Sequence, residues 1–198
     1  MDSFRRFIER FQNYSQLTNL GKIARRYFAM NAFDGVLTII GVLMGNFTAG
    51  VEDARIVVTT GMATCVAMGI SGLWGAYLTE AAERQRELLE LEGYTLTDLS
   101  DTTLGKASRT AVVIVALVDG LSPFLAALVV LTPFFVPKLF PSLRWTYLTA
   151  IALALISLFS LGAFLGHISR RNIAVYGFRT VIAGGISIVI SLLLGGSP

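Results

Sequence analysis

One carboxylate lies deep inside an apolar segment of this sequence and is the first candidate for chemistry. Asp34 interrupts an apolar run over residues 28–50. An ionised side chain costs at least about 2.5–3.5 kcal/mol near the centre of a bilayer, so such acids usually line a path for water or ions. The alternative is an aspartate whose side chain reaches the lipid headgroups. Asp34 lies about 10 Å along a helix from Tyr27, which is too deep for its short side chain to reach them. This position predicts a site for a cation or a proton.

Four glutamates form a second candidate feature, on a helix that we expect to continue from a membrane span into water. The members of this glutamate stripe are Glu80, Glu83, Glu87 and Glu90. They are three, four and three residues apart, so they share one face of a helix. Such a stripe can hold divalent cations through oxygen ligands. The alternative is a solvated face that Arg84 and Arg86 neutralise in part, and the spacing supports both interpretations equally.

The composition indicates an all-α integral membrane protein that positions these groups. Of 198 residues, 54% are hydrophobic and 15% are charged, which is too apolar for an ordinary soluble domain. Five segments are long and apolar enough to span a bilayer. They cover about residues 28–50, 56–79, 110–135, 146–166 and 173–195. We therefore predict a transmembrane bundle of five helices over residues 21–198, with a short cytosolic acidic helix at residues 80–92.

The segment before the first span predicts an amphipathic helix on the membrane surface. Within residues 1–20, aromatic and aliphatic side chains recur at helical spacing while arginines occupy other faces. The alternative is that this helix packs on a partner or on a cytosolic segment of the chain. The segment lacks the continuous apolar core of a cleavable signal peptide. The single cysteine, Cys65, excludes an internal disulfide and a cysteine-rich metal cluster, and no basic patch for nucleic acid is present.

Several small residues predict where the helices approach or bend. Gly41 and Gly45 form a small-xxx-small pattern in the first span, and glycines at every third position between residues 69 and 75 leave one stripe of the second span nearly bare. Gly35 is a position where a helix can loosen and offer a backbone carbonyl. Pro123 predicts a broken or kinked third span.

The distribution of basic residues orients the spans. Bases gather before the first span, between the second and third, and between the fourth and fifth, which predicts a cytosolic N-terminus. Asp34, Asp119 and Arg179 then lie six to nine residues from cytosolic ends, at comparable depth, where they can meet. One arginine cannot neutralise two carboxylates, so a cation or a proton is the natural further partner. The alternative is an internal salt bridge between Arg179 and either aspartate.

With these residues in place, the chain resembles the vacuolar iron transporter family, whose members carry ferrous iron and manganese. The resemblance depends on Asp34-Gly35 with its arginine-rich lead-in, on the run Gly75-Ala76-Tyr77-Leu78-Thr79 followed by Glu83-Arg84, and on a glycine-rich fifth span. It extends over about residues 25–196. The resemblance implies a homodimer whose first helices line a central path, a metal-binding role for Asp34, and export from the cytosol driven by proton exchange. It also implies a cytosolic helical domain whose glutamates collect metal.

The sequence departs from the family pattern in three places. The segment between the second and third spans is short, so the glutamate stripe corresponds to a reduced form of the cytosolic domain. The proline expected after the first Asp-Gly pair is replaced by the region of Ile39 and Ile40. The methionine that the family places inside the second helix falls at Gly72, and Met68, one turn away, is the candidate substitute.

These observations lead to one main hypothesis, a secondary transporter that exports ferrous iron or manganese from the cytosol. Asp34 and Met68 are candidate metal ligands, Asp119 is a second ligand or a proton carrier, and the glutamate stripe attracts ions at the mouth. Arg179 would bias the pKa values of the carboxylates rather than touch the ion. We expect a homodimer in the lipid bilayer, in the cell membrane of a prokaryote or a vacuolar-type membrane of a eukaryote. Its partners would be divalent metal ions and protons, with no permanently bound cofactor and no nucleic acid.

The alternative hypothesis is a membrane scaffold or regulatory subunit that does not transport, with internally neutralised aspartates. An enzyme is not expected. The sequence has no pair of catalytic carboxylates on one element, no nucleophile with a base, and no phosphate-binding loop.

Overall fold

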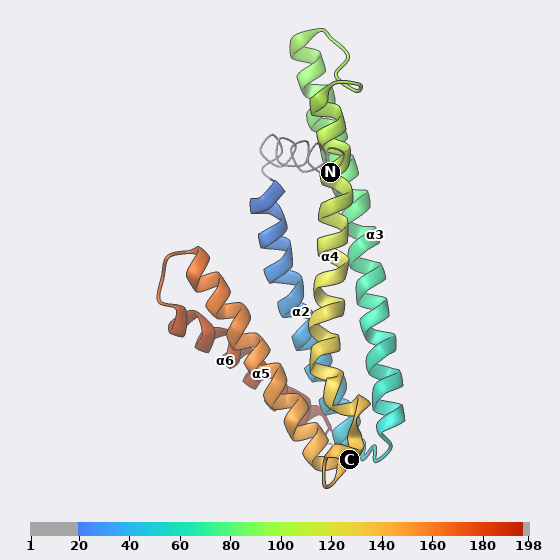
Figure 1. Cartoon of the computed structure of the whole chain (residues 1–198), viewed down its shortest axis with the longest axis vertical. Helices are drawn as coiled ribbons and strands as arrows, with labels where there is room; N and C mark the ends of the chain where they lie inside the picture. Colours follow the sequence, from blue (N-terminus) through green and yellow to red (C-terminus); the bar gives the residue numbers. More distant parts are fainter. Residues whose placement is uncertain (1–19, 196–198) are drawn as a thin grey trace, which may run out of the picture. The chain divides into compact units, whose positions relative to one another are not determined.

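The computed structural model describes residues 20–195, which form five α-helices and one short 3₁₀ helix (Figure 1). In chain order the elements are α2 (Leu20–Thr48), α3 (Ala54–Thr95), α4 (Thr103–Phe135), η1 (Pro137–Leu139), α5 (Leu143–Ile168) and α6 (Ile173–Gly195). Each of the five α-helices is long and apolar enough to cross a membrane, and the described residues contain no strand. The predicted all-α fold with five spanning helices is therefore confirmed.

Two parts of the fold prediction remain predictions. The amphipathic surface helix proposed for residues 1–20 lies outside the described residues, except that Leu20 begins α2. The side of the membrane on which the N-terminus lies also stays a prediction.

The helices are longer than the apolar runs at their polar ends. α2 and α4 begin well before the predicted spans at residues 28 and 110, because helical backbone continues through the basic residues that precede each apolar run. The acidic segment at residues 80–92 is helical as predicted, and it belongs to α3, which continues past Gly93 to Thr95. α4 is unbroken at Pro123, although the proline lacks the N–H that would bond to the carbonyl four residues earlier. The helix is therefore not broken at Pro123, and the other possibility, a kink, stays a prediction.

The chain divides into two compact units, each of which takes parts of several helices. Unit 1 comprises Met1–Phe28 and Ile70–Leu121, so its described part holds the start of α2, the long second part of α3 and the first part of α4. Unit 2 comprises Ala29–Gly69 and Ser122–Pro198, which includes the rest of α2, the start of α3, the end of α4, and both α5 and α6.

The core of unit 2 is a cluster of aliphatic and aromatic side chains from α2, α3, α4 and α5. Its largest fully buried members are Phe134, Ile39, Ile40, Leu43, Leu131 and Leu158. Tyr147 of α5 anchors one end of the cluster, because its ring makes edge contacts with Phe47 and Phe134 at centroid distances of 5.3 and 5.0 Å. Its hydroxyl donates a hydrogen bond to the carbonyl of Val51 at 3.3 Å.

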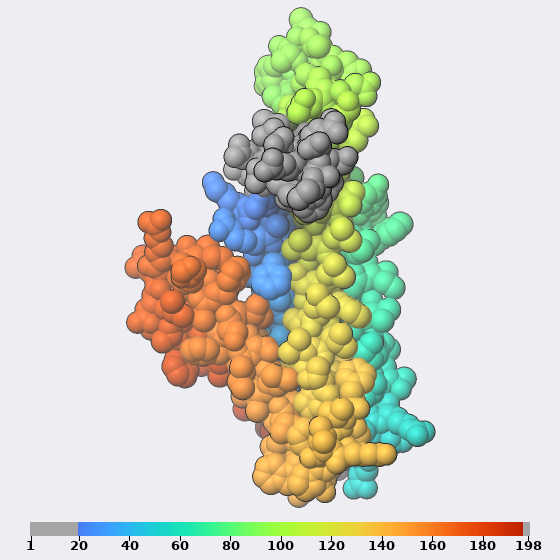
Figure 2. Space-filling view, viewed as in Figure 1, coloured from blue at the N-terminus to red at the C-terminus, as the bar shows by residue number. Residues whose placement is uncertain are grey.

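Glycine allows α5 and α6 to pack backbone to backbone in unit 2. A side chain at Gly162 of α5 would lie 2.5 Å from the carbonyl oxygen of Tyr176 in α6, so only hydrogen fits. Thr180 of α6 donates a hydrogen bond across the pair to the carbonyl of Leu158 at 2.7 Å. The two helices are orange to red in Figure 2, and their close packing explains part of the glycine content of the fifth span.

Unit 1 contains a helical hairpin of α3 and α4 that closes in a short polar connection. Glu92 accepts a hydrogen bond from the backbone N–H of Leu99 at 2.8 Å, and Asp98 accepts one from the N–H of Ser100 at 2.8 Å. Closer to the predicted membrane, Gly72 of α3 packs on α4, where a β-carbon would lie 3.0 Å from the Asp119 carbonyl oxygen. The predicted bare stripe of α3 is therefore used for close packing at Gly72.

Candidate functional site

Asp34 lies at the midpoint of α2, about 21 Å from each end at 1.5 Å per residue. Its side chain is exposed in the single chain. Positions 34, 38, 41 and 45 lie on one side of the helix, because steps of four, three and four residues return to the same face. We call this surface the Asp34 face and define it by Asp34, Thr38, Gly41 and Gly45. Thr38 and Gly45 are exposed as well, and a β-carbon at either glycine would meet no atom within 4 Å.

The next residue along α2 fixes the orientation of Asp34. Gly35 is buried, and a β-carbon there would lie 2.5 Å from the carbonyl oxygen and 2.6 Å from the α-carbon of Pro123 in α4. Both residues belong to unit 2. The sequence suggested that the helix could loosen at Gly35. This is not observed, since α2 is continuous from Leu20 to Thr48. The missing side chain lets α2 and α4 touch through their backbones, which directs Asp34 away from the core.

Asp34 lacks an ionic partner within the part of the chain that the structure describes. Among residues 20–195, no ion pair within 4 Å includes Asp34 or Arg179. Arg179 of α6 is exposed, and its guanidinium carbon lies 5.6 Å from the centre of the Tyr176 ring, in a cation–π arrangement. The internal salt bridge between Arg179 and Asp34 is therefore absent.

Asp119 has a different environment from Asp34. It is 9% exposed on α4 within unit 1, next to the close approach of Gly72. Whether Asp119 meets Asp34 and Arg179 stays a prediction, because the last two belong to unit 2.

The glutamate stripe lies on one long helix and is largely paired with arginines of that helix. Arg84 reaches Glu80 at 3.6 Å and Glu87 at 3.2 Å, and Arg86 reaches Glu90 at 3.0 Å. The hydroxyl of Tyr27 in α2 donates a further hydrogen bond to Glu80 at 3.2 Å. The Glu80 and Arg84 side chains are only 14% and 13% exposed, whereas those of Arg86 and Glu90 are mostly in solvent.

This pairing limits what the glutamate stripe can do alone. Within residues 20–195, no group of three or more His, Cys, Asp or Glu side chains is gathered closely enough to hold a metal ion. A divalent cation on the stripe would therefore have to displace Arg84 or use oxygen ligands from outside the described chain. Sequence spacing could have revealed these pairs, because Glu80 and Glu90 each lie four residues from an arginine. No sequence spacing of this kind indicated the hydrogen bond from Tyr27 to Glu80.

The packing of α3 explains why Gly72 occupies the position at which the family has a methionine. At Gly72 any side chain would press on the Asp119 carbonyl and on the α-carbon of Gly120, 3.1 Å from an ideal β-carbon. A methionine does not fit at this position in the observed packing. Met68, the candidate substitute, is half-buried and packs against the core of unit 2.

Two similarities to known proteins identify the family of this chain. The profile of the VIT family matches residues 26–96, which include the Asp34 face and all of α3 with the glutamate stripe. An uncharacterized protein of Methanocaldococcus jannaschii is 30% identical over 177 residues, which cover 86% of this chain and 87% of that protein. The chain belongs to the VIT family.

Membership in the VIT family confirms the resemblance to vacuolar iron transporters. The protein is a multi-pass membrane protein of a metal-ion transport family. The VIT family is a family of transporters, which agrees with the expectation that the chain is not an enzyme. The matched residues contain Asp34, Met68 and all four glutamates of the stripe, while Asp119 lies beyond the matched segment.

Proposed function

We propose that this VIT family protein exports ferrous iron or manganese from the cytosol in exchange for protons, as a homodimer. One observation carries the proposal: an acidic side chain lies halfway along a spanning helix, exposed on a face of small residues and without an ionic partner in the described chain. An ionised carboxylate facing lipid would cost at least about 2.5–3.5 kcal/mol. The Asp34 face therefore needs a polar cover.

A second copy of the chain is the cover that fits this face best. Gly41 and Gly45 leave the surface of α2 bare beside Asp34, and such small-residue surfaces allow two membrane helices to approach closely. Two copies related by a twofold axis would bring two Asp34 carboxylates to one path, because the same patch of each chain would face the axis. Two carboxylates with the Thr38 hydroxyls supply the oxygen ligands that manganese and ferrous iron accept.

Proton exchange follows from the same pair of carboxylates. Two acids that share a site repel each other when both are ionised, so a divalent cation or protons must compensate their charge. Metal binding would release protons, and proton uptake from the opposite side would release the metal. We assign Asp119 as a second ligand or proton carrier and Met68 as a soft ligand of the same path. Arg179 would act on the charge balance without touching the ion.

The glutamate stripe would serve as the collecting surface at the cytosolic mouth. Three of its four carboxylates start in ion pairs with Arg84 or Arg86, so metal capture by these three would be an exchange in which a cation replaces a guanidinium. Such an exchange favours weak, rapidly reversible binding, which suits an attracting surface better than a storage site.

Metal flux into proteoliposomes with an imposed pH gradient tests the proposal. Asp34→Asn keeps the size of the side chain and removes its charge, and it should abolish manganese and ferrous iron flux. Asp101→Asn is the matched control, because Asp101 is exposed in the connection between α3 and α4 and its loss should leave flux unchanged. Flux at the wild-type rate in the Asp34→Asn protein would refute the role assigned to Asp34. Flux that is independent of the pH gradient would refute the coupling to protons.

A further inference from the structure

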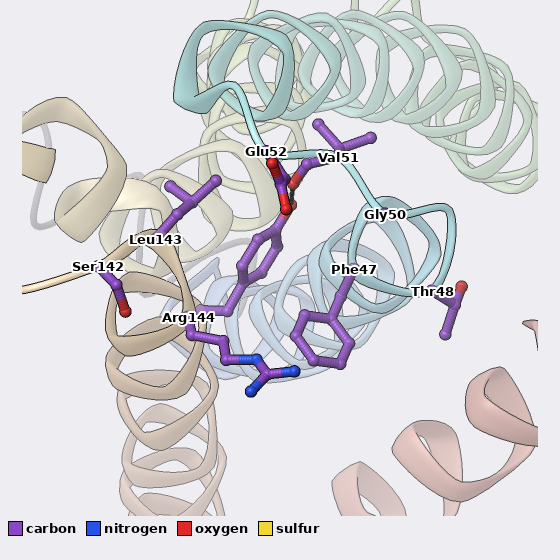
Figure 3. Close-up of a pocket in the computed structure, with 9 residues that line it drawn as sticks. Phe47, Thr48, Gly50, Val51, Glu52, Ser142, Leu143 and Arg144 are labelled. Carbon is purple, nitrogen blue, oxygen red and sulfur yellow. Dashed lines mark hydrogen bonds between the residues drawn. The ribbon is translucent and has the colours of Figure 1, made fainter.

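A hollow opens in unit 2 where α2 ends and where α3 and α5 begin (Figure 3). Its volume is about 720 Å³. Arg144 extends from the start of α5 toward Phe47 at the end of α2, and Glu52 points into the hollow from the connection between α2 and α3. Tyr147 forms part of the wall, and its hydroxyl is already bonded to the carbonyl of Val51.

A second, purely apolar groove of about 280 Å³ continues from this hollow along the helices. The two spaces share Phe47, Arg144 and Tyr147. Beyond these shared residues the groove is lined by Met44, Leu148, Ile151, Ile188 and Leu192, from α2, α5 and α6. The combined space is therefore polar at one end, apolar at the other, and open along the surface of spanning helices.

The charges of the hollow are unused within the described chain. Glu52 and Arg144 are both exposed, and no ion pair within 4 Å among residues 20–195 includes either of them. One carboxylate and one guanidinium give the hollow no net charge but two separate binding points. Exposed Trp145 is next to Arg144 in the chain, and tryptophan is typical of the level where lipid headgroups meet hydrocarbon.

We propose that the hollow and groove bind one phosphoethanolamine lipid of the surrounding membrane, with its phosphate on Arg144, its ammonium on Glu52 and an acyl chain in the groove. A guanidinium presents paired N–H donors that match phosphate oxygens. A primary ammonium carries three N–H donors for a carboxylate. A phosphocholine headgroup lacks those donors, and a phosphoglycerol headgroup lacks the cation, so each would leave Glu52 without a charged hydrogen-bond donor. A metal ion is a poor occupant, because Glu52 is the single carboxylate among residues 20–195 that lines the hollow.

This inference does not depend on the transport proposal. Native mass spectrometry of the delipidated full chain in detergent would test it, by titration with phosphoethanolamine, phosphocholine and phosphoglycerol lipids of identical acyl chains. We expect one tightly held phosphoethanolamine lipid per chain, bound at least about tenfold more tightly than the other two. Arg144→Gln should weaken the binding of all three lipids. Glu52→Gln should remove the preference for phosphoethanolamine and leave phosphoglycerol binding unchanged.

Two matched variants serve as controls. Lys138→Gln removes an exposed base from the same connection between α4 and α5, and Asp53→Asn removes the acid next to Glu52; neither residue lines the hollow. Both should bind lipid as the wild type does. Thermal unfolding of Arg144→Gln and Glu52→Gln without lipid should match the wild type, since both side chains are exposed.

Three results would overturn the proposal. If the three lipids bind equally well, and equally well to the wild type and to Arg144→Gln, the lipids make ordinary bilayer contacts only. A preference for phosphoglycerol would mean that Arg144 acts alone as an anion site. Efficient disulfide formation between copies of a Leu148→Cys protein with Cys65→Ala would mean that a second chain, rather than a lipid, covers the groove.

Discussion

Asp34 and the glutamate stripe are both acidic, yet the chain treats their charges in opposite ways. Three of the four stripe glutamates are held by Arg84 or Arg86 on the same helix. Asp34 has no such partner among residues 20–195, and the small residues of its helix face leave it uncovered. The two arginines therefore offset half of the negative charge of the stripe without any ligand. The charge of Asp34 has to be balanced from outside residues 20–195, which is the property expected of a transport site.

The largest effect should come from disrupting the contact between Gly35 and Pro123 that directs Asp34 away from the core. Gly35→Ala places a methyl group 2.5 Å from the Pro123 carbonyl oxygen, so α2 and α4 must separate. Overpacking of this kind costs about 1–3 kcal/mol. We expect a lower unfolding temperature in detergent and a loss of metal flux. Gly185→Ala in α6 is the control, because its methyl group meets no atom within 4 Å. Equal stability of the two variants would contradict the assigned role of Gly35.

The next effect concerns the cover of the Asp34 face. Gly41→Leu fills open space in the single chain, so the fold should persist, but the bulky side chain should block the approach of a second copy. We expect the variant to be monomeric in detergent by light scattering and inactive in flux assays. Retained dimers with full activity would place the dimer interface elsewhere.

A smaller effect should follow when the stripe loses its internal cation. Arg84→Gln leaves Glu80 and Glu87 without their partner, so their carboxylates become available to metal. Manganese affinity of the stripe should rise by about threefold to tenfold, a change of about 0.6–1.4 kcal/mol. Titration calorimetry in an Asp34→Asn background would isolate the stripe. Arg86→Gln is the milder comparison, because the Arg86–Glu90 pair lies mostly in solvent. Unchanged affinity in Arg84→Gln would remove the stripe from the list of collecting sites.

The smallest effect is a pH dependence confined to the connection between α3 and α4. Hydrogen bonds from the Ser100 side chain and from its backbone N–H lower the pKa of Asp98, since they favour the charged carboxylate. The resulting stabilisation is present above the ordinary aspartate pKa of about 3.9 and is lost as the pH falls through the lowered value. Amide exchange at Ser100, corrected for the intrinsic pH dependence, should show less protection at the acid end. Asp98→Asn keeps an acceptor oxygen and should abolish this dependence; its persistence would assign it to another group.

The sequence predicted the architecture well because apolar length alone specifies spanning helices. The five spans and the acidic continuation of α3 are all present in the structure. The ends were less predictable, since helical backbone in α2 and α4 continues through basic residues that leave the apolar run. Pairing within the stripe was readable from its i,i+4 spacing, although the sequence alone did not decide between paired and metal-binding glutamates.

Contacts between helices were the part that sequence patterns could not supply. From the sequence, Gly35 was a position where the helix could loosen and Pro123 a position where it could break. In the structure the backbones of these two residues pack against each other, and this contact depends on where α2 and α4 cross. Likewise, the sequence showed only that Gly72 replaces the methionine of the family. The close packing of Gly72 on the backbone of Asp119 explains why a glycine occupies this position. The hollow at Glu52 and Arg144 joins two segments that are distant in the chain, residues 47–52 and 142–147, so no local sequence pattern indicated it.

Equilibrium binding of manganese to the purified protein tests the central claim most directly. The account predicts that wild-type protein binds manganese at the Asp34 face and that Asp34→Asn lowers the affinity of this site by at least about tenfold, or about 1.4 kcal/mol. Asp101→Asn should bind as the wild type does. Identical manganese affinity and stoichiometry in Asp34→Asn and wild type would contradict the claim that this carboxylate holds the transported ion.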